Sequence, residues 1–541
     1  MRKNLEIPQG KRTKLYRFLE ILPGAISYGA IILLFVLSLI DPVLGAIYLF
    51  ILIASTLVKA IGVAYRTVQG YEVIKRAERV DWRKRVEDLS HPHEAYERLR
   101  DDNNKSYHFE QHIENLKMMA AMGKEYPSPD KVYHVVMMAA YNEGPEIIGP
   151  SIEAVKNTTF PNDHIIFVLA YEQRGGEAIA NTAENLKKQY KGVFRDFLLV
   201  QHPNNLPGEV IGKGPNLTYA GKAVSKYVVE KHLPVENIIV TSLDSDNHMA
   251  PKYLDSVAYE FITHPNRQRL SYQPVSLFMN NIWDAPAPTR VIAVSNSFFN
   301  IISTMRPHTL RNFASHSQPL QALEAMDFWS KRTIVEDGHQ YWRSLFFFSG
   351  DYSVVPIRIP IYQDAVMDDN FWKTVKAQFI QVRRWYYGAS DVAYVGSKLF
   401  VKKDKRIMPF WQLFPKFWRL LDGHVTLAIM APLITFGAWV PMLMNFSSHT
   451  MVAYNLPNIV SVIETIASLG LLITVLVSLR MLPKRPARYR KGRNILMIVQ
   501  WILMPVTSIL YQSIAAYYAQ TRLMLGLYME KFDVTKKVVK K

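Results

Sequence analysis

Two carboxylates follow a strand-like segment in the middle of the chain. Residues 237–243 read NIIVTSL, an apolar run typical of a buried strand, and Asp244 and Asp246 come directly after it. Carboxylates spaced i and i+2 in a turn can share one hard cation, and Mg²⁺ and Mn²⁺ bind through one or two carboxylates plus substrate phosphates. The pattern predicts a Mg²⁺ or Mn²⁺ site with Asp246 and Asp244 as ligands. His248 could extend this site, but we expect it to cap the following helix.

A second acidic pair and an arginine motif lie farther along. Glu336 and Asp337 stand in TIVEDG, and Gln381, Arg384 and Trp385 belong to QVRRW. A carboxylate beside a hydroxyl can take its proton as a bond forms, an arginine can stabilise a departing diphosphate, and a tryptophan face can hold a sugar ring. Two structural alternatives stay open. The acidic pair could stabilise a helix N-terminus, and the Arg-Trp pair could be a surface cation–π contact.

Three more strand-like segments end in polar turns. They cover 132–140, 164–170 and 197–201, and the turns supply Tyr141, Asn142 and Glu143, then Glu172, then a Gly-Lys-Gly sequence with Lys213 at its centre. Ligands of open α/β sheets bind beyond the carboxyl ends of strands, so these residues predict a nucleotide site. Lys213 and its flanking glycines offer a cation and backbone N–H groups to an anion, although a flexible surface loop is an equal alternative.

The chemistry-bearing residues lie in one soluble-type region. Across 131–405, apolar strand-like runs alternate with amphipathic helical segments, which is the pattern of an α/β domain with a mainly parallel sheet. Residues 66–130 are charge-dense and helix-forming, and we interpret them as a helical connector without chemistry of its own.

Long apolar runs flank this region on both sides. Residues 18–65 predict a transmembrane hairpin, since each half can cross a hydrocarbon core of ~30 Å. A cleaved signal peptide is the alternative for the first run. Residues 406–421 carry Trp and Phe beside Lys and Arg, which favours an interfacial amphipathic helix over a core helix. Residues 422–518 predict further transmembrane helices, and the basic segments 1–17 and 519–541 form the ends.

Basic loops predict the sidedness of the chain. Lys and Arg flank the first hairpin and fill 480–493, so these parts and the α/β domain should be cytosolic in a multi-pass protein of the plasma membrane. The last apolar run, 495–518, leaves a conflict. One crossing would place the Lys-rich tail outside, whereas the charge rule favours a tail inside. Glu464, in the expected span 458–479, could line a polymer path or simply reach the interface.

Composition excludes several classes of protein. The 541 residues contain no Cys, which removes disulfide scaffolds, zinc ribbons and thiol nucleophiles, and 49% hydrophobic content excludes a disordered chain. The formal charge of +18 could indicate nucleic acid or lipid headgroups. Because the basic residues gather in short loops beside apolar runs, we expect membrane lipids as partners and no nucleic acid.

The ordered set of YNE, DSD, VED and QVRRW, with membrane helices on both sides, resembles the membrane-integrated family 2 glycosyltransferases, of which cellulose, hyaluronan and chitin synthases are members. The motifs cover about 131–388. The resemblance implies a GT-A-like α/β domain inserted between transmembrane helices. It also implies inverting, metal-dependent transfer from a nucleotide sugar, expected to be a UDP-sugar, to a growing polysaccharide at the cytosolic face, with translocation coupled to synthesis as an option.

The resemblance also implies residue roles. Asn142, Glu143 and Glu172 would contact the nucleoside, Lys213 a phosphate, Asp244 the ribose or diphosphate, and Asp246 the metal, while Asp337 would be the general base and Gln381, Arg384 and Trp385 would close on the diphosphate and form the acceptor platform. The Gly-rich acceptor segment usual in the family is replaced by 306–329, which leaves the acceptor and the sugar open. A non-processive transferase with a lipid acceptor is the main alternative. A catalytically silent scaffold or transport component is the other.

Overall fold

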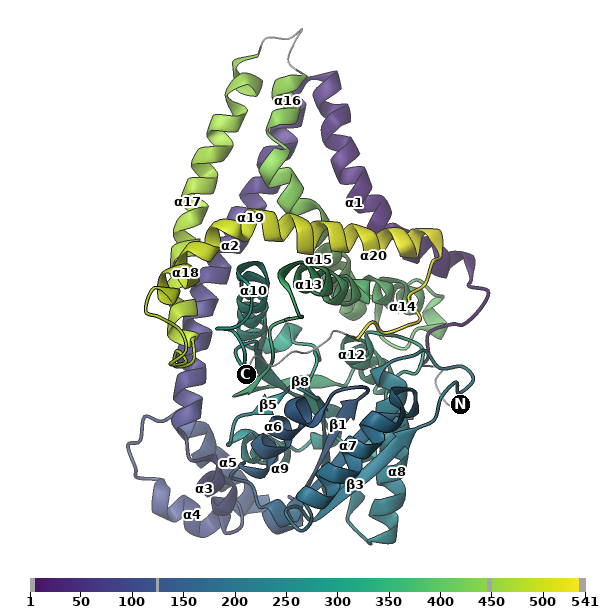
Figure 1. Ribbon diagram of the computed structural model, residues 1–541, viewed down its shortest axis with the longest axis vertical. Coiled ribbons are helices and arrows are strands. Elements are labelled where there is room, and N and C mark those ends of the chain that lie inside the picture. The colour runs from purple at the N-terminus through teal and green to yellow at the C-terminus, as the bar shows by residue number, and fades with distance from the viewer. Residues whose placement is uncertain (1–4, 123–125, 445–449, 535–541) are drawn as a thin grey trace.

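The computed structural model describes residues 5–122, 126–444 and 450–534, without the side chains of 60, 464, 466–469 and 471. Glu464 therefore lies outside the described side chains. The chain forms an α/β domain and a group of long apolar helices that rises from one end of it (Figure 1).

One eight-stranded sheet forms the centre of the α/β domain, in the order β3-β2-β1-β4-β7-β6-β8-β5. The strands are β1 (Tyr133–Ala140), β2 (Ile165–Glu172), β3 (Asp196–His202), β4 (Ile238–Asp244), β5 (His248–Met249), β6 (Leu270–Leu277), β7 (His316–Pro319) and β8 (Ser353–Tyr362). The first four in this order pair in parallel, as do β6 and β8, whereas β7 pairs antiparallel with β4 and β6, and β5 antiparallel with β8. The predicted parallel part is confirmed, and the antiparallel insertion makes the sheet mixed.

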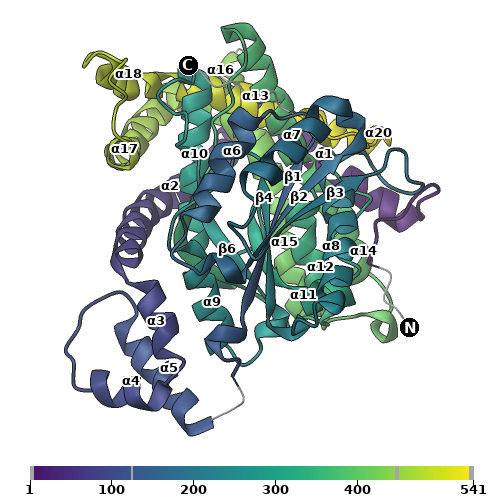
Figure 2. The ribbon, with the colours of Figure 1, turned by 60° about the horizontal axis from the view of Figure 1, so that its bottom comes forward.

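Helices cover both faces of the sheet, because successive side chains of a strand point to opposite sides. On β1, Val135 and Met137 pack with α8 (Lys213–Glu230) and α12 (Glu336–Phe347), while Val136 and Met138 pack with α6 (Pro145–Lys156), α7 (Gly176–Gln189) and α9 (Tyr253–Thr263). Figure 2 shows this layering. Parallel strands buried on both faces need continuous apolar runs, and β2 is buried along its whole length.

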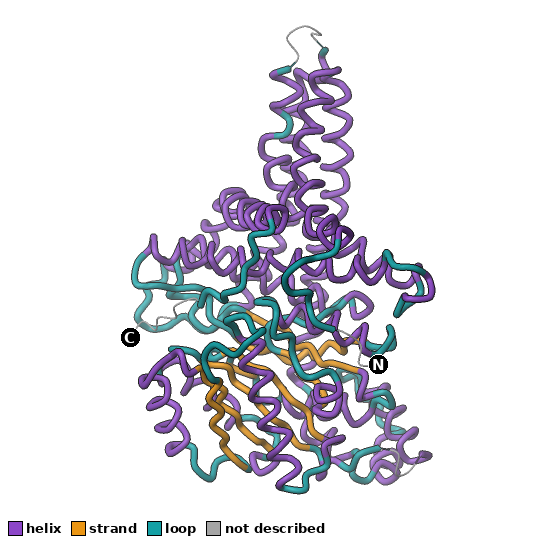
Figure 3. Tube along the Cα trace, turned by 90° about the vertical axis from the view of Figure 1, so that its right-hand side faces the viewer, coloured by secondary structure: helices purple, strands orange, loops and turns teal. Residues whose placement is uncertain are grey.

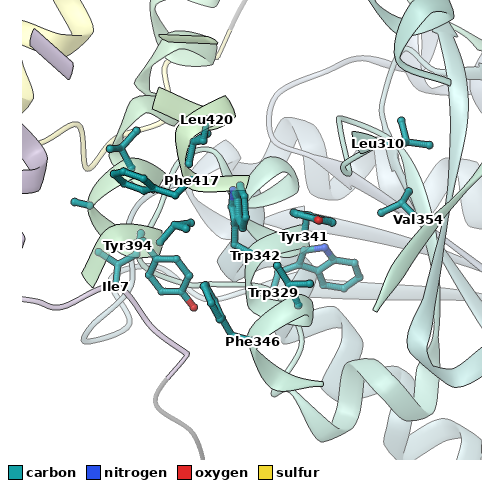
Figure 4. Packing of buried hydrophobic residues seen from close by; sticks show 14 of the residues in the cluster. Ile7, Leu310, Trp329, Tyr341, Trp342, Phe346, Val354, Tyr394, Phe417 and Leu420 are labelled. Carbon is teal, nitrogen blue, oxygen red and sulfur yellow. The ribbon is translucent and has the colours of Figure 1, made fainter. Parts of the chain in front are cut away.

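The α/β domain has four further helices, and all but the shortest of them contact the apolar helices. They are α10 (Ala287–Thr304), α11 (Leu320–Ala325), α13 (Phe371–Tyr386) and α14 (Ser390–Leu399). Trp342 of α12 and Tyr394 of α14 share one buried cluster with Phe417 and Leu420, which belong to α15 (Phe410–Phe436) (Figure 4). Shared packing of this kind couples the two parts of the molecule.

Within the part of the chain that the structure describes, four helical stretches are long and apolar enough to cross a membrane: α1 (Lys14–Ile40), α2 (Pro42–Arg79), α15 and Arg493–Leu525. α1, α2, α16 (Trp439–Leu443) and α17 (Met451–Met481) rise together from the domain (Figures 1 and 3). Asp41 separates the first two helices. Its Oδ1 accepts the Val43 N–H at 2.8 Å, and Pro42 occupies the first turn of α2.

Two element boundaries differ from the sequence prediction. The expected interfacial helix over 406–421 is the first part of α15, which continues to Phe436 despite Pro415 and Pro432 within it. α2 likewise runs on to Arg79 rather than ending near residue 65. It leads into α3 (Trp82–Asp88), α4 (Pro92–Leu99) and α5 (Phe109–Met122), whose buried residues pack with α9.

The last apolar run is arranged differently from a simple span. The stretch from α18 (Arg493–Val499) through α19 (Met504–Thr507) to α20 (Ile514–Leu525) lies across the base of the rising helices (Figure 1). After Gly526, which has a φ of 71°, the chain returns to the α/β domain. There Ile211 N donates to Glu530 O at 3.1 Å, and Phe532 N donates to Ile211 O at 2.8 Å. The described tail up to residue 534 therefore lies beside the α/β domain, which favours the arrangement with both on one side of a membrane, and the number of crossings stays a prediction.

Candidate active site

The carboxyl ends of three parallel strands meet at one place. In the register of the sheet, Ala139 of β1 lies beside Asp244 of β4, and Ala140 lies beside Tyr171 of β2. The turns after these strands therefore lie next to one another, as predicted from the strand-like segments. Tyr141 begins the first of these turns.

Lys213 and Asp244 form an ion pair at this edge. Lys213 is the first residue of α8, and its Nζ donates to Asp244 Oδ1 at 2.7 Å. Gly214 permits this placement, because a Cβ there would lie 2.4 Å from the carbonyl oxygen of Ser330 and 3.0 Å from Glu336 Cβ. The absence of a side chain at Gly214 thus lets the first turn of α8 approach the start of α12.

The predicted acidic pair occupies the first turn of α12. Asp337 Oδ1 accepts the Gly338 N–H at 2.8 Å, and Glu336 is 3% exposed, so both structural and chemical roles fit the pair. Burial raises the pKa of Glu336 to about 8, with a further contribution from Asp337, while Lys213 opposes the shift. Burial also raises the pKa of Asp337, again opposed by Lys213. A carboxylate with a raised pKa is a stronger base near neutral pH.

Lys213 stays charged in this acidic setting. Burial alone would lower the pKa of Lys213, but the nearby carboxylates of Asp244, Glu336 and Asp337 outweigh it and raise the pKa above its ordinary value. The Lys213 side chain therefore faces three carboxyl groups from two elements, β4 and α12. Such a cation can also bind a phosphate.

Arg384 reaches the same group from α13. It interacts electrostatically with Glu336, Asp244 and Asp337, and burial lowers the pKa of its guanidinium below the ordinary value. The guanidinium lies 3.6 Å from the ring centroid of Phe532, and its Nη1 donates to the carbonyl oxygen of Asp533 at 3.0 Å. Its aromatic partner is therefore Phe532, and the alternative of a surface Arg384–Trp385 pair is wrong.

The other two residues of the QVRRW motif have different surroundings. Trp385 is half-buried, and its ring centroid lies 6.1 Å from that of Phe278. Gln381 Oε1 accepts from Gln378 Nε2 at 3.1 Å, within the same helix. These contacts do not join Trp385 or Gln381 to the acidic group, so their predicted roles remain predictions.

The turns after β1 and β2 form one unit. Glu143 Oε2 accepts the N–H groups of Tyr141 at 2.7 Å and Asn142 at 3.1 Å. Arg174 lies 3.8 Å over the Tyr141 ring, and its Nη2 donates to Glu172 Oε1 at 3.0 Å. Sequence reasoning missed Arg174, although it stands two residues after Glu172 in the same turn. Asn142 is exposed and stands at the rim.

Gly175 explains why these two turns can touch. A Cβ at Gly175 would lie 1.9 Å from the Tyr141 carbonyl oxygen, closer than any side chain could approach. The backbone contact between the turns therefore requires glycine at this position.

Asp246 lies in the turn between β4 and β5, and its carbonyl oxygen accepts from Asn280 Nδ2 at 3.0 Å. The residue is 9% exposed. His248 belongs to β5, and α9 is capped by Lys252, so the expected capping role of His248 is wrong.

The donor chemistry of this turn fits a divalent ion only together with a ligand. Among the residues that the structure describes, no group of three or more His, Asp or Glu side chains could hold a metal by itself. Asp244 and Asp246 supply two carboxylates, a number suited to Mg²⁺ or Mn²⁺ when substrate phosphates complete the coordination.

Sequence reasoning also missed the C-terminal segment, residues 526–534. Arg383 Nη1 donates to Tyr518 Oη at 3.2 Å, and Arg383 also forms an ion pair with Asp533. Phe532 and Asp533 thus contact both arginines of QVRRW. The sequence analysis used only the charge of the tail, and the Phe-Asp pair among its lysines was the available signal.

Comparisons with known proteins show only limited structural similarity. No protein-family model matches the chain, and no curated protein matches it. Among solved structures, the mannosyltransferase PcManGT of Pyrobaculum calidifontis, in complex with GDP-Man and Mn²⁺, has a TM-score of 0.38 at 14% identity, covering 76% of this chain and 94% of that one. S. aureus TarS has a TM-score of 0.33 at 10% identity, covering 73% and 93%. Because both scores lie below 0.5, neither carries an argument about this chain.

Proposed function

We propose that the protein is a glycosyltransferase that moves a sugar from a nucleoside diphosphate sugar to an acceptor hydroxyl at a membrane surface. One observation supports the proposal most. Asp337, Lys213, Asp244 and Arg384 come from four elements and interact electrostatically with one another beyond the carboxyl ends of β1 and β4. A base, two cations that suit a diphosphate and a carboxylate of the predicted metal pair thus share one site.

The residues divide the reaction between them. In the proposed step, the acceptor oxygen forms a bond to the anomeric carbon while the bond from that carbon to the diphosphate oxygen breaks. The hydroxyl proton passes to Asp337, and the bonding electrons leave with the nucleoside diphosphate. One displacement of this kind inverts the anomeric carbon and needs no covalent intermediate.

Lys213 and Arg384 would stabilise the charge that gathers on the departing diphosphate, since both are cations in a partly buried site. Asp246 and Asp244 would hold Mg²⁺ or Mn²⁺, which supplies further positive charge to the phosphates when bound. Glu172, Glu143 and the Tyr141 ring would line the nucleoside side.

The acceptor has two candidates. The resemblance of QVRRW to processive enzymes favours a polysaccharide, whereas a lipid acceptor is favoured by a basic surface beside the apolar helices, described below. In both, the four apolar helical stretches hold the site at the bilayer. We place the site on the cytosolic side of the plasma membrane, following the charge of the loops.

The test is a screen of nucleotide sugars with the purified full-length protein. We expect one donor to give metal-dependent release of nucleoside diphosphate, and sizing of the product separates a polymer from a single added sugar. Asp337→Asn should lower turnover about a hundredfold or more while donor binding stays within a few-fold, because the base acts on the acceptor.

Asp404→Asn is the matched control, since Asp404 is an exposed carboxylate of a short 3₁₀ turn. Equal turnover in Asp337→Asn and Asp404→Asn would remove Asp337 from the mechanism. Absence of turnover and of nucleotide binding with every donor would instead favour a silent scaffold.

A further inference from the structure

Four arginines gather where the α/β domain meets the apolar helices. This arginine cluster consists of Arg66 on α2, Arg306 and Arg311 after α10, and Arg419 on α15. Electrostatic interactions link Arg306 to Arg66 and Arg419, and link Arg311 to Arg419. The four side chains therefore form one connected group of cations.

Packing contacts independently place these elements together. A Cβ at Gly70 of α2 would lie 2.4 Å from Ile301 Cγ2 and 3.1 Å from Met305 Cγ, so Arg66, one helical turn away, lies near Arg306. Lys59 Nζ lies 3.7 Å from Asp422 Oδ2, which joins α2 to α15 close to Arg419.

The arginine cluster has no counter-ion of its own. Among the described residues, none of its four members forms an ion pair with a carboxylate. Arg66 Nη1 donates only to the Gly62 carbonyl oxygen, at 3.0 Å, and the Arg311 guanidinium lies 5.7 Å from the Trp342 ring centroid. The neighbouring carboxylates are already engaged. Asp391 binds His339 Nδ1 at 2.6 Å, and Asp422 pairs with Lys59.

Holding these cations together is unfavourable without a ligand. Arg306 and Arg311 are half-buried, and burial lowers the pKa of each guanidinium. Arg66 and Arg419 add to the shift at Arg306, whereas at Arg311 the contribution of Arg419 is opposed by Asp391. Like charges brought together in a partly buried place destabilise the fold, so such a group is a candidate binding site. Guanidinium groups suit phosphate because their planar forks bind it through paired hydrogen bonds.

The position of the arginine cluster indicates a ligand at the bilayer surface. Trp411 and Trp418 of α15 are 79% and 58% exposed, and exposed tryptophans beside basic residues are typical of the headgroup region. α2 also carries exposed Ile61 and Val63 just before Arg66. The cations thus stand where apolar lipid-facing surface ends.

The arginine cluster also lies close to the candidate active site. Arg311 interacts with Asp391, whose partner His339 follows Asp337 by two residues on α12. Lys416 of α15 donates to Tyr341 Oη of α12 at 3.3 Å. A ligand in the arginine cluster would therefore lie against the helix that carries the base.

We propose that the arginine cluster binds the phosphate of a lipid-borne acceptor and so holds the acceptor chain at the bilayer surface beside α12. The role of this ligand as acceptor rests on the proposed function, whereas its binding does not. The transfer step is unchanged: the acceptor hydroxyl still gives its proton to Asp337, and the phosphate serves only as an anchor.

The experiment uses full-length protein in neutral detergent micelles doped with hexadecyl phosphate. Binding is followed by intrinsic tryptophan fluorescence, because Trp342 and Trp418 flank the arginine cluster. We expect hexadecyl phosphate to bind at least about tenfold more tightly than hexadecanol or inorganic phosphate, since both the charge and the chain contribute.

Variants locate the binding. The double variant Arg306→Gln with Arg419→Gln should weaken hexadecyl phosphate binding about tenfold or more. The single variant Arg306→Lys, which keeps the positive charge and an intact Arg419, should bind hexadecyl phosphate more tightly than the double variant. Arg490→Gln is the matched control, because Arg490 is an exposed arginine of the basic loop outside the cluster. Equal binding by the double variant and the control would overturn the proposal.

Other ligands separate the possible sources of phosphate. Phosphatidylglycerol binding as tightly as hexadecyl phosphate would point to an ordinary phospholipid headgroup and overturn the acceptor assignment. Inorganic phosphate binding equally well would overturn the lipid part. If a soluble uronate oligosaccharide bound more tightly than hexadecyl phosphate, the lipid acceptor would be overturned in favour of an anionic polymer.

The result is distinguishable from failure of the proposed function. Nucleotide binding measured on the double variant should equal that of the wild type, because the arginine cluster does not include Lys213 or Arg384. If no nucleotide sugar binds to any form while hexadecyl phosphate still binds through the cluster, the glycosyltransferase proposal fails and the phosphate site stands.

Discussion

At the scale of single residues, adjacent carboxylates on α12 differ in their surroundings. Glu336 is almost fully buried and its Oε2 has no hydrogen-bond partner among the described residues, whereas Asp337 is half-buried and accepts a backbone N–H. With its pKa raised to about 8, Glu336 holds a proton at neutral pH. A neutral Glu336 avoids two adjacent negative charges and leaves Asp337 available as the proposed base.

The pKa of Glu336 predicts a pH dependence of stability. Because the folded pKa of about 8 exceeds the ordinary 4.5, the folded state binds more protons between these values, and stability falls as pH rises from about 4.5 to 8. Glu336→Gln should remove this fall and stabilise the protein above pH 8 relative to wild type. Thermal unfolding of wild type and Glu336→Gln in metal-free buffer at pH 5, 7 and 9 measures this pH dependence of stability. Parallel pH profiles of the two proteins would contradict the assignment.

Gly214 gives a second prediction at this scale. Gly214→Ala should cost about 1–3 kcal/mol of unfolding free energy and weaken donor binding, because its Cβ would overlap the Ser330 carbonyl oxygen. Gly149→Ala is the control, since a Cβ there meets nothing within 4 Å. In the interior of α6, alanine is also more favourable than glycine by up to about 1 kcal/mol. Denaturant unfolding compares the two, and equal destabilisation would refute the argument.

The sequence identified most charged members of the site, because each follows an apolar strand or stands in a short motif. It could not identify Arg174 or Asp533. Arg174 acts through a ring contact with Tyr141, and Asp533 is remote in sequence from Arg383 and Arg384. Contacts of that kind depend on tertiary packing, which local patterns do not encode.

At the scale of elements, α12 is held by the N-terminal segment, residues 5–9. Glu6 pairs with Arg343 of α12 and accepts from Ser330 Oγ at 2.7 Å, while Leu5 O accepts from Tyr394 Oη at 2.9 Å. The basic N-terminus expected from the sequence therefore contains a docked acidic residue. This segment supports the helix that carries Asp337.

Glu6→Gln should loosen that support. Arg343 is 1% exposed and would lose its carboxylate partner, at a cost of about 1–3 kcal/mol. We expect kcat to fall more than the KM for the donor changes, because α12 carries the proposed base rather than the proposed nucleotide contacts. Steady-state kinetics at saturating donor measure this, with Glu97→Gln of exposed α4 as control. A change in donor KM alone would contradict it.

Strands β1 to β4 were predicted from apolar runs, whereas β7 was not. Its residues are His-Ser-Gln-Pro, yet all four are buried. Gln318 Nε2 donates to Tyr352 Oη at 3.0 Å, and Gln318 Oε1 accepts from Gln340 at 3.0 Å. A strand stabilised by side-chain hydrogen bonds rather than by apolar burial gives no hydrophobic pattern, so the mixed sheet was not expected.

At the scale of the whole molecule, the rising helices and the returning C-terminal segment allow the proposed membrane sidedness to be tested. Because the chain contains no Cys, single cysteines can report them. Met451→Cys, at the far end of α17, should react with a membrane-impermeant maleimide in sealed right-side-out vesicles. Leu527→Cys, after α20, should react only after permeabilisation. The native residues are 73% and 52% exposed, so access does not limit labelling. Labelling of Leu527→Cys in sealed vesicles would contradict the arrangement.

The return of the C-terminal segment also bears on biosynthesis. Phe532 and Asp533, which contact Arg384, come later in the order of synthesis than the other residues of the site and than the described apolar helices. A nascent chain therefore carries its base and its cations before the wall formed by these two residues exists. Under the proposed function, sugar transfer by a chain not yet extended to these two residues should be disfavoured, so that the apolar helices are made before nucleotide sugar is consumed.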